Sequence, residues 1–201
     1  MPHDPLLARR LVLGVWTAWA LFWLLMSIGT KTTQRRESTR SRLAHVLPLL
    51  VGGLLIGAPS LPWDAVLGMR LWPASGILYG VGLALLVAGL AFSVWARVHL
   101  GSNWSGVVTV KEGHELIRTG PYGCVRHPIY TGILTAVIGT VICSGTLGAA
   151  LGVVIIAAAL TRKLRVEEAL MRETFPGQYQ KYCAAVPALI PFTRSRRSVP
   201  R

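Results

Sequence analysis

The chain has 201 residues, 52% of them hydrophobic and 14% charged, with a formal net charge of +13 at pH 7. This composition excludes an ordinary soluble globule and is typical of a single-domain, polytopic membrane protein. The basic residues fall between apolar runs, where positive charge sets topology, and no RNA- or DNA-binding motif accompanies them, so we expect no nucleic-acid partner. The three cysteines lack metal-ligand spacing and are odd in number, so we expect neither a metal site nor a disulfide framework.

Apolar runs predict about five transmembrane helices, at residues 11–29, 43–60, 74–96, 129–143 and 146–161. The run 129–143 is barely long enough to span, and only Ser144 and Gly145 separate it from the next run, which predicts a helical hairpin. The first run is too long for the core of a signal peptide, so we expect the protein to retain it. The predicted fold class is therefore all-α, with residues 1–201 forming one integral membrane domain.

Small and aromatic residues predict how these helices pack. Small residues recur every three or four positions within 74–96, at Gly76, Gly80, Ala84, Ala88 and Ala91, which is typical of a close helix-packing face. In the second run, Gly52, Gly53 and Gly57 also favour close approach. Three tryptophans of the first run recur at helical spacing, Trp16, Trp19 and Trp23, and we interpret them as packing or interfacial anchors rather than cofactor ligands.

Charge predicts the topology. The basic segments 31–42, 97–128 and 162–201 mark one side of the membrane as cytoplasmic. With five spans, the N-terminus is then outside, and the C-terminus and any site built from 97–128 and 162–193 are cytoplasmic. We expect a multi-pass protein of the inner or plasma membrane if the source is bacterial. The basic tail 194–201 is expected to contact lipid headgroups at most.

The polar segment 114–132 has no obvious packing purpose in such an apolar chain. It is rich in His, Tyr and Arg, and its prolines and glycines fix turns and permit close backbone approach. We interpret it as a ligand-binding loop at the membrane face; the alternative is an ordinary basic cytoplasmic loop.

A second polar element is the amphipathic helix expected from Arg162. Lys163 and Glu167 are four residues apart and share a face of it, whereas Glu168 points about 100° away from Glu167. This pair fits either a surface ion pair or a site for a ligand that carries both an amine and a carboxylate.

The motifs GPYGCVRHPIYTG and EEALMRETFPGQYQKYCAAVPALIPF, in this order, resemble the membrane methyltransferases of the isoprenylcysteine carboxyl methyltransferase family. Its relatives include phospholipid N-methyltransferases. The resemblance covers about residues 97–193. It implies S-adenosyl-L-methionine as cofactor, with S-adenosyl-L-homocysteine as product, bound on the cytoplasmic side.

The resemblance also implies roles for single residues. His114, Glu115, Leu116 and Ile117 match the family's first cofactor strip, Tyr122 matches the tyrosine of its GPY, and His127, Pro128, Ile129 and Tyr130 match its HPxY. Glu167 matches its cofactor-binding acid and would hold the methionyl ammonium. Lys163 occupies the place of a substrate-contacting arginine, which keeps the positive charge but loses the bidentate fork. Pro176 is a second departure, since the family has Phe-Gly-x-x-Tyr there.

The chemistry of methyl transfer fits these residues. Displacement at a sulfonium is in line, so an enzyme mainly positions donor and acceptor. The candidate catalytic residues are His127, Arg126 and Glu168. His127 or Arg126 would meet the carboxylate of the cofactor, and His127 or Glu168 would accept a proton from an amine acceptor. The ring of Tyr122 or Tyr130 would lie near the sulfonium.

The expected partners are the lipid bilayer and a lipophilic or membrane-permeant methyl acceptor. A carboxylate of the isoprenylcysteine type, a phospholipid amine and a small thiol are all compatible with the sequence, and the oligomeric state stays open. The first alternative is an NADPH-dependent membrane reductase of the sterol type, which would want a further cationic cluster for the 2′-phosphate and more spans. The second is a non-enzymatic membrane protein.

Overall fold

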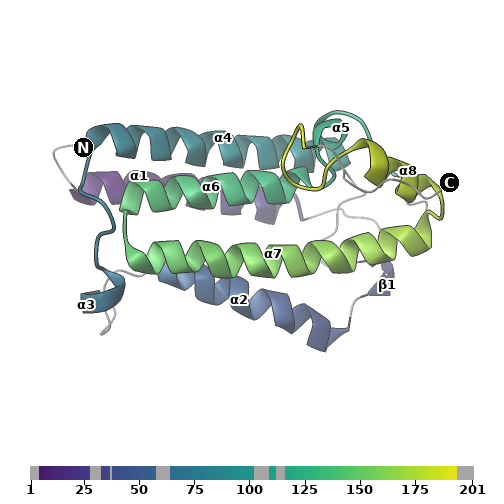
Figure 1. Cartoon of the computed structure of the whole chain (residues 1–201), viewed down its shortest axis with the longest axis horizontal. Helices are drawn as coiled ribbons and strands as arrows, with labels where there is room; N and C mark the ends of the chain where they lie inside the picture. Colours follow the sequence, from purple (N-terminus) through teal and green to yellow (C-terminus); the bar gives the residue numbers. More distant parts are fainter. Residues whose placement is uncertain are drawn as a thin grey trace.

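The structure is a computed structural model, and it describes residues 5–27, 33–36, 38–57, 64–101, 109–111 and 116–193. Within these ranges the long helices lie side by side along one axis (Figure 1): α1 (Pro5–Leu25), α2 (Thr39–Gly57), α4 (Gly76–Leu100), α6 (Pro128–Ser144) and α7 (Leu147–Thr174). The short helices are α3 (Asp64–Leu67), α5 (Pro121–Cys124) and α8 (Gln178–Ala185). Strands β1 (Thr33–Arg36) and β2 (Thr109–Lys111) form one antiparallel pair. The bundle is helical as predicted, and the small sheet is an addition.

The long helices support a multi-pass membrane protein. Among the described residues, four stretches are long and apolar enough to cross a membrane: Leu6–Leu25, Thr39–Gly57, Gly76–Leu100 and Leu147–Thr174. Helix α6 is apolar but has only 17 residues, in line with the expectation that the run 129–143 is barely long enough. The multi-pass character is therefore confirmed, whereas a count of five spans stays a prediction.

Helix α7 is longer than predicted. We expected a span at 146–161 and a separate amphipathic helix from Arg162, but the structure has one continuous helix of 28 residues. The reason is that no glycine or proline lies between Gly152 and Pro176, so nothing interrupts the helical hydrogen bonds. At about 1.5 Å per residue, α7 is about 42 Å long, which exceeds the hydrocarbon core of about 30 Å. Its polar end can therefore extend beyond the hydrocarbon.

The hairpin predicted after the third span is present. Helices α6 and α7 run side by side (Figure 1), and Gly145 and Thr146 connect them. Gly145 has a φ of +66°, in the left-handed region that favours glycine, and its N–H caps the helix by donating to Val141 O. The Thr146 side chain accepts a hydrogen bond from Ala149 N and so begins α7.

The close packing of α4 on α6 depends on Gly82 and Gly89 of α4, which the sequence did not single out. A Cβ at Gly89 would lie 2.5 Å from Gly132 O, and one at Gly82 would lie 2.6 Å from Gly139 O. The face predicted for α4 is wrong. Its small residues, Gly76, Gly80, Ala84, Ala88 and Ala91, are all exposed, and the buried face holds Gly82, Leu86, Gly89, Ser93 and Ala96.

Helix α2 packs on α7 through a similar contact. Gly52 lies against Gly152, where a Cβ at Gly52 would be 2.9 Å from Gly152 O. This confirms the expectation for Gly52. Gly53 and Gly57 have open space around their Cα atoms and are not part of this contact. Helices with small residues on two faces offer alternative packings, and only the partner helix decides between them.

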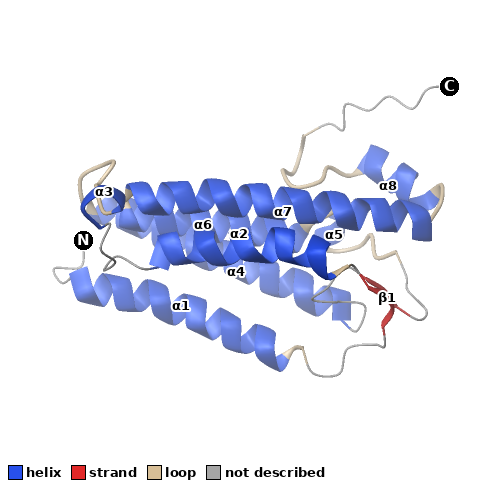
Figure 2. Cartoon of the chain, turned by 90° about the horizontal axis from the view of Figure 1, so that it is seen from below, coloured by secondary structure: helices blue, strands red, loops and turns tan. Residues whose placement is uncertain are grey.

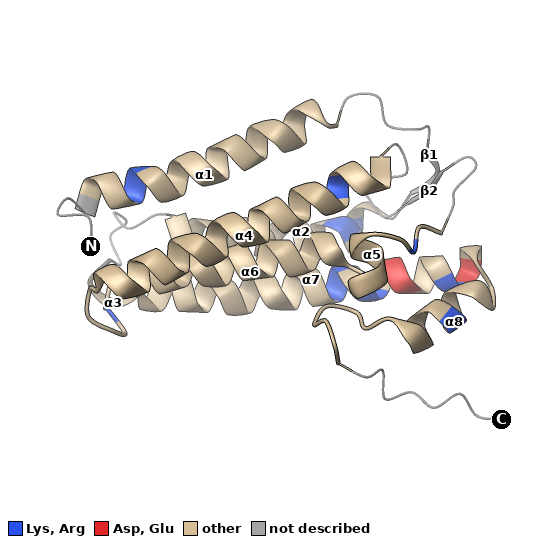
Figure 3. Cartoon of the chain, turned by 90° about the horizontal axis from the view of Figure 1, so that it is seen from above, with Lys and Arg blue, Asp and Glu red and all other residues tan. Residues whose placement is uncertain are grey.

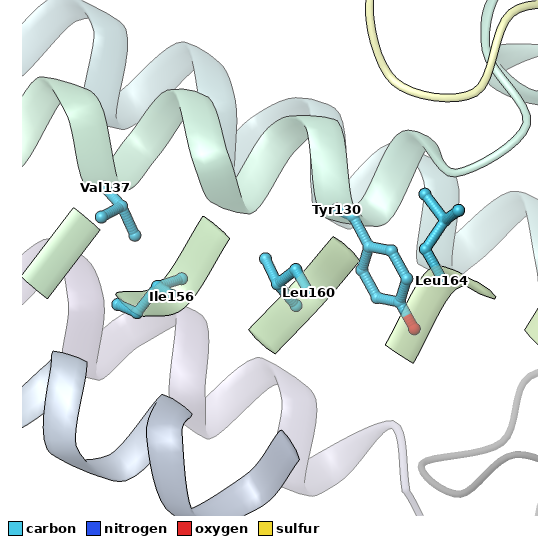
Figure 4. Close-up of a cluster of buried hydrophobic side chains, with 5 residues drawn as sticks. All are labelled: Tyr130, Val137, Ile156, Leu160 and Leu164. Carbon is cyan, nitrogen blue, oxygen red and sulfur yellow. The ribbon is translucent and has the colours of Figure 1, made fainter. Parts of the chain in front are cut away.

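The core between α6 and α7 holds Tyr130 and Val137 from α6 and Ile156, Leu160 and Leu164 from α7 (Figure 4). Tyr130 and Leu164 lie at one end of this apolar cluster (Figure 4), and the Tyr130 hydroxyl contacts Glu167 in the polar part of α7.

Helix α1 lies at the edge of the bundle (Figure 2). The indole N–H of Trp16 donates to Thr140 Oγ1 at 3.0 Å, and that of Trp19 donates to Ser93 Oγ at 2.8 Å. The interpretation of these two tryptophans as packing residues is therefore confirmed.

The charged residues lie mostly at one end of the bundle. In Figure 3, acidic and basic residues gather on the end of α7 near α5 and α8, whereas long stretches of the helices carry neither. At the same end, the buried guanidinium of Arg97 donates to Met26 O and Gly101 O, beyond the last turns of α1 and α4. Arg97 is therefore more than a topology marker, because it joins these two helix ends.

Candidate functional site

Backbone hydrogen bonds join two segments that are about sixty residues apart, the RHP segment before α6 and the chain after α8. Arg126 N donates to Pro187 O at 2.8 Å and His127 N donates to Ala188 O at 3.0 Å. Thr131 Oγ1 adds a hydrogen bond to Leu189 O at 2.7 Å. The RHP segment before α6 and the chain after α8 therefore support each other, which holds the start of α6 in place.

A second set of contacts fixes the turn before α5. Gly120 has a φ of +57°, and a Cβ there would lie 2.7 Å from the His99 ring, so the position demands glycine. The His99 ring in turn contacts Thr119 Oγ1 at 2.9 Å and stacks on Tyr122. Tyr182 on α8 donates its hydroxyl to Tyr122 O at 2.5 Å. Tyr122 is therefore held between the end of α4 and α8.

Glu168 is the centre of a buried ionic cluster. Its Oε1 accepts from Arg126 Nε at 3.0 Å and from Arg126 Nη2, while its Oε2 accepts from Arg172 Nη2 at 2.7 Å. Arg126 Nη1 also donates to Val186 O. Arg126 and Glu168 therefore join α6, α7 and the chain after α8, and each oxygen of Glu168 already accepts a charged hydrogen bond.

Glu167 has a different environment. Its Oε1 accepts a 2.5 Å hydrogen bond from the Tyr130 hydroxyl and lies 3.9 Å from Lys163 Nζ, and its Oε2 is 3.6 Å from His127 Nδ1. The side chain of Glu167 keeps 26% of its surface exposed, against 9% for Glu168. Of the two neighbouring carboxylates, Glu167 is the one that a ligand could reach.

His127 lies between the two carboxylates. Its Nε2 is 3.4 Å from Glu168 Oε1, and its ring is parallel to that of Tyr130, with 5.6 Å between the centroids. Burial alone would lower the pKa of His127, but its contacts with Glu167 and Glu168 outweigh burial and raise this pKa above the ordinary 6.5. The two carboxylates therefore favour the protonated form of the imidazole.

Aromatic and cationic groups complete the described part of the site. Lys163 Nζ lies over the Tyr130 ring, 5.5 Å from its centroid. Burial, and then the negative charge of Glu167, raise the pKa of the Tyr122 hydroxyl above its ordinary value of 10.0, so Tyr122 stays neutral at physiological pH.

The structure brings together most of the residues that the sequence singled out: Tyr122, Arg126, His127, Pro128, Ile129, Tyr130, Lys163, Glu167 and Glu168. Leu116 and Ile117 are half-buried in the chain before Gly120. His114 and Glu115 lie outside the described residues. The roles of all these positions stay predictions.

Two residues of the cluster were missed. Arg172 pairs with Glu168 and Tyr182 holds Tyr122 O. The spacing of four between Glu168 and Arg172 on one helix is a signal that could have found the first. The second required the position of α8. Pro176, the departure from the family pattern, lies between Phe175, which caps the C-terminal end of α7, and Gly177, which precedes α8.

These features define a helical, multi-pass membrane protein with a charged and aromatic site at one end of its bundle. The sequence profile of the isoprenylcysteine carboxyl methyltransferase family matches residues 82–173. This range includes both carboxylates and the whole RHP segment, so the resemblance that the sequence indicated is confirmed.

Curated relatives match about half of the chain. The protein-S-isoprenylcysteine O-methyltransferase B of Arabidopsis thaliana is 27% identical over 114 residues, covering 55% of this chain and 58% of the relative. The protein-S-isoprenylcysteine O-methyltransferase of Saccharomyces cerevisiae is 30% identical over 115 residues, covering 56% of this chain and 48% of the relative. The matched segment thus spans about half the length of these relatives.

The fold has a counterpart among solved structures. The eukaryotic intramembrane Ras methyltransferase, an isoprenylcysteine carboxyl methyltransferase, superposes with a TM-score of 0.55 at 23% identity. The superposition covers 79% of this chain and 54% of that one. The membrane architecture is therefore shared beyond the segment that aligns in sequence.

Proposed function

We propose that the protein is a membrane methyltransferase that uses S-adenosyl-L-methionine and acts on a lipophilic acceptor. The observation that carries this proposal is the position of Glu167. It is a partly exposed carboxylate beside the Tyr130 hydroxyl and the His127 ring, in the segment that matches the methyltransferase family.

The residues fit the charges of this cofactor. Glu167 offers an anion for the methionyl ammonium, and the ring face of Tyr130 or Tyr122 suits a sulfonium. Four cationic groups, Arg126, His127, Lys163 and Arg172, surround the two carboxylates, so the cluster keeps an excess of positive charge for a carboxylate of the cofactor or the acceptor. When bound, the cofactor supplies an electrophilic methyl group.

The protein residues would act by position and charge. His127 and Tyr130 fix the orientation of the Glu167 carboxylate. Arg126 and Glu168 keep the start of α6 against α7. We therefore assign Arg126 and Glu168 a positioning role. An in-line displacement needs such a rigid frame and the exclusion of water, and it needs no covalent nucleophile.

The electrostatics favour an anionic acceptor. A carboxylate needs no general base, whereas an amine must first lose a proton. The His127 ring already lies between the carboxylates of Glu167 and Glu168, and both oxygens of Glu168 are engaged by arginines, so neither group is well placed to take up that proton. We therefore propose a carboxylate of the isoprenylcysteine type as the first acceptor to test, ahead of a phospholipid amine or a small thiol.

The orientation is part of the proposal. The charged end of the bundle, where α5 and α8 lie, would face the cytoplasm because most of the basic residues flank it (Figure 3). The acceptor would then reach the site from the cytoplasmic leaflet.

Calorimetric titration of the detergent-solubilised protein with S-adenosyl-L-homocysteine, and separately with NADPH, tests the cofactor. Saturable binding of the first is expected, weakened at least tenfold in Glu167→Gln. Glu173→Gln, an exposed carboxylate further along α7, is the matched control and should bind normally. Binding of NADPH alone would replace the proposal with the reductase.

The acceptor is tested by transfer of a labelled methyl group in mixed micelles. N-acetyl-S-farnesylcysteine, phosphatidylethanolamine and a small alkyl thiol are supplied separately. Label that appears only in the phospholipid would contradict the carboxylate assignment while leaving methyl transfer intact.

A further inference from the structure

A cavity of about 640 Å³ lies between α1, α2, α4, α6 and α7. Its walls are apolar, with Trp16, Leu49, Val137 and Ile156 among the residues that line it. The indole N–H groups on its wall are already bonded, as those of Trp16 and Trp19 are to Thr140 and Ser93. Such a wall suits a hydrocarbon chain and offers little to a polar ligand.

The cavity is distinct from the candidate site. None of the site residues lines it, and on α6 it reaches from Ile133 to Ser144. In Figure 4, the row from Val137 to Tyr130 leads from the cavity wall toward the site. Tyr130 and Ser144 are fourteen residues apart on one helix, which places the far end of the cavity about 20 Å from the site.

The far end is marked by two arginines, Arg9 on α1 and Arg70 after α3, and the cavity lining contains no carboxylate. Arg9 Nη2 donates a long, 3.4 Å hydrogen bond to Gly57 O, and Arg70 Nε donates one of 3.4 Å to Trp72 O. In the part of the chain that the structure describes, neither guanidinium belongs to an ion pair.

We propose that this cavity binds the hydrocarbon chain of an anionic lipid, with the head group at Arg9 and Arg70. The lipid comes from the leaflet opposite the candidate site. Arginines are uncommon on the outer side of a membrane protein, and a pair of them at the mouth of an apolar cavity complements an anionic head group. This inference does not depend on the proposed methyl transfer.

The position of the charges distinguishes a bound lipid from a methyl acceptor. An acceptor must place its reactive group at the Tyr130 end, whereas the arginines hold an anion at the other end. Rim residues Leu13 and Leu54 are 46% and 53% exposed, so the cavity borders the surrounding bilayer, from which a lipid can enter.

Native mass spectrometry of the full chain tests the proposal. The protein is released from micelles that contain equal amounts of dioleoylphosphatidylglycerol and dioleoylphosphatidylcholine, which share their chains and differ in head-group charge. We expect one retained phosphatidylglycerol per chain. The preference should fall about fivefold for each arginine replaced, in Arg9→Gln and Arg70→Gln.

Two matched controls separate this site from general effects of charge and bulk. Arg10→Gln removes a neighbouring exposed arginine of α1 that does not line the cavity, and it should keep the preference. Gly53→Leu adds a side chain inside the cavity, where a Cβ has open space, and should reduce retention of the lipid. Gly80→Leu adds the same side chain on the exposed face of α4 and should have no effect.

Equal retention of the two lipids by the unaltered protein would overturn the proposal. So would a preference that survives in the Arg9→Gln/Arg70→Gln protein. Displacement of the retained lipid by N-acetyl-S-farnesylcysteine, mole for mole, would also overturn it and assign the cavity to the acceptor.

Discussion

At the scale of single residues, Glu167 and Glu168 show how neighbours in sequence divide two tasks. They point to different sides of α7, so Glu168 faces Arg126 and Arg172 and Glu167 faces Tyr130 and His127. Both oxygens of Glu168 are engaged, and this residue holds elements together. Glu167 keeps an accessible surface, and we therefore expect it to bind the cofactor.

The hydrogen bond from the Tyr130 hydroxyl should fix the orientation of the Glu167 carboxylate. We expect Tyr130→Phe to weaken binding of S-adenosyl-L-homocysteine about tenfold, because a hydrogen bond to a charged group contributes about 1.5–3 kcal/mol. Calorimetric titration measures it. The matched control is Tyr79→Phe, which removes the hydroxyl that donates to Ala8 O at the other end of the bundle. Equal affinity in the two variants would contradict this role.

The charge of His127 should make stability depend on pH. Because its pKa is raised in the folded state, the stabilisation is fully present below the unfolded pKa of about 6.5 and is lost as pH rises through the folded pKa. We expect the apparent melting temperature of the protein to fall more steeply than that of His127→Gln as the pH rises above about 6.5. Parallel curves for the two proteins would show that this charge is not coupled to folding.

At the scale of elements, the contact of α4 with α6 depends on backbone approach. Gly89 lies so close to Gly132 O that a methyl group would displace one helix. We expect Gly89→Ala to destabilise the protein by about 1–3 kcal/mol, the cost typical of overpacking. Unfolding in mixed micelles with increasing denaturing detergent measures this.

Gly80→Ala is the control for this prediction. It makes the same change in the same helix, at a position where a Cβ meets nothing within 4 Å. Both variants gain the same helix propensity, so the difference between them reports the contact. A Gly89→Ala protein as stable as Gly80→Ala would show that the helices separate without cost.

At the scale of the whole molecule, the predicted orientation can be tested with the exposed thiol of Cys124, which lies on α5 at the charged end. In a protein with Cys143→Ala and Cys183→Ala, expressed in a bacterial inner membrane, we expect a membrane-impermeant maleimide to label Cys124 in inverted vesicles only. Labelling of Cys124 in intact cells would show that the topology is the reverse of the predicted one.

A second thiol completes this test. Ala65→Cys, on exposed α3 at the opposite end, placed in a protein that also carries Cys124→Ala, should be labelled in intact cells. The same accessibility for both positions would contradict the placement of the two ends on opposite sides of the membrane.

The sequence by itself determined the helical membrane class and most of the residues that gather at the site. The long apolar runs have few structural alternatives in a bilayer, because only internally bonded backbone survives there. Arg126, His127 and Tyr130 lie within one short motif, RHPIY, so they can be recognised from the sequence without knowledge of the fold. The spacing of Lys163 and Glu167 also follows from the helix repeat alone.

Only the tertiary structure decided which surfaces meet. Gly80 and Gly82 look equally suitable for packing, yet α6 contacts only Gly82 of these two, because burial depends on the partner helix. The different environments of Glu167 and Glu168 likewise depend on residues after α8, nearly twenty positions away, that reach Arg126. Contacts between distant segments carry no local signal, so the cavity bordered by Arg9 and Arg70 was visible only once the chain was folded.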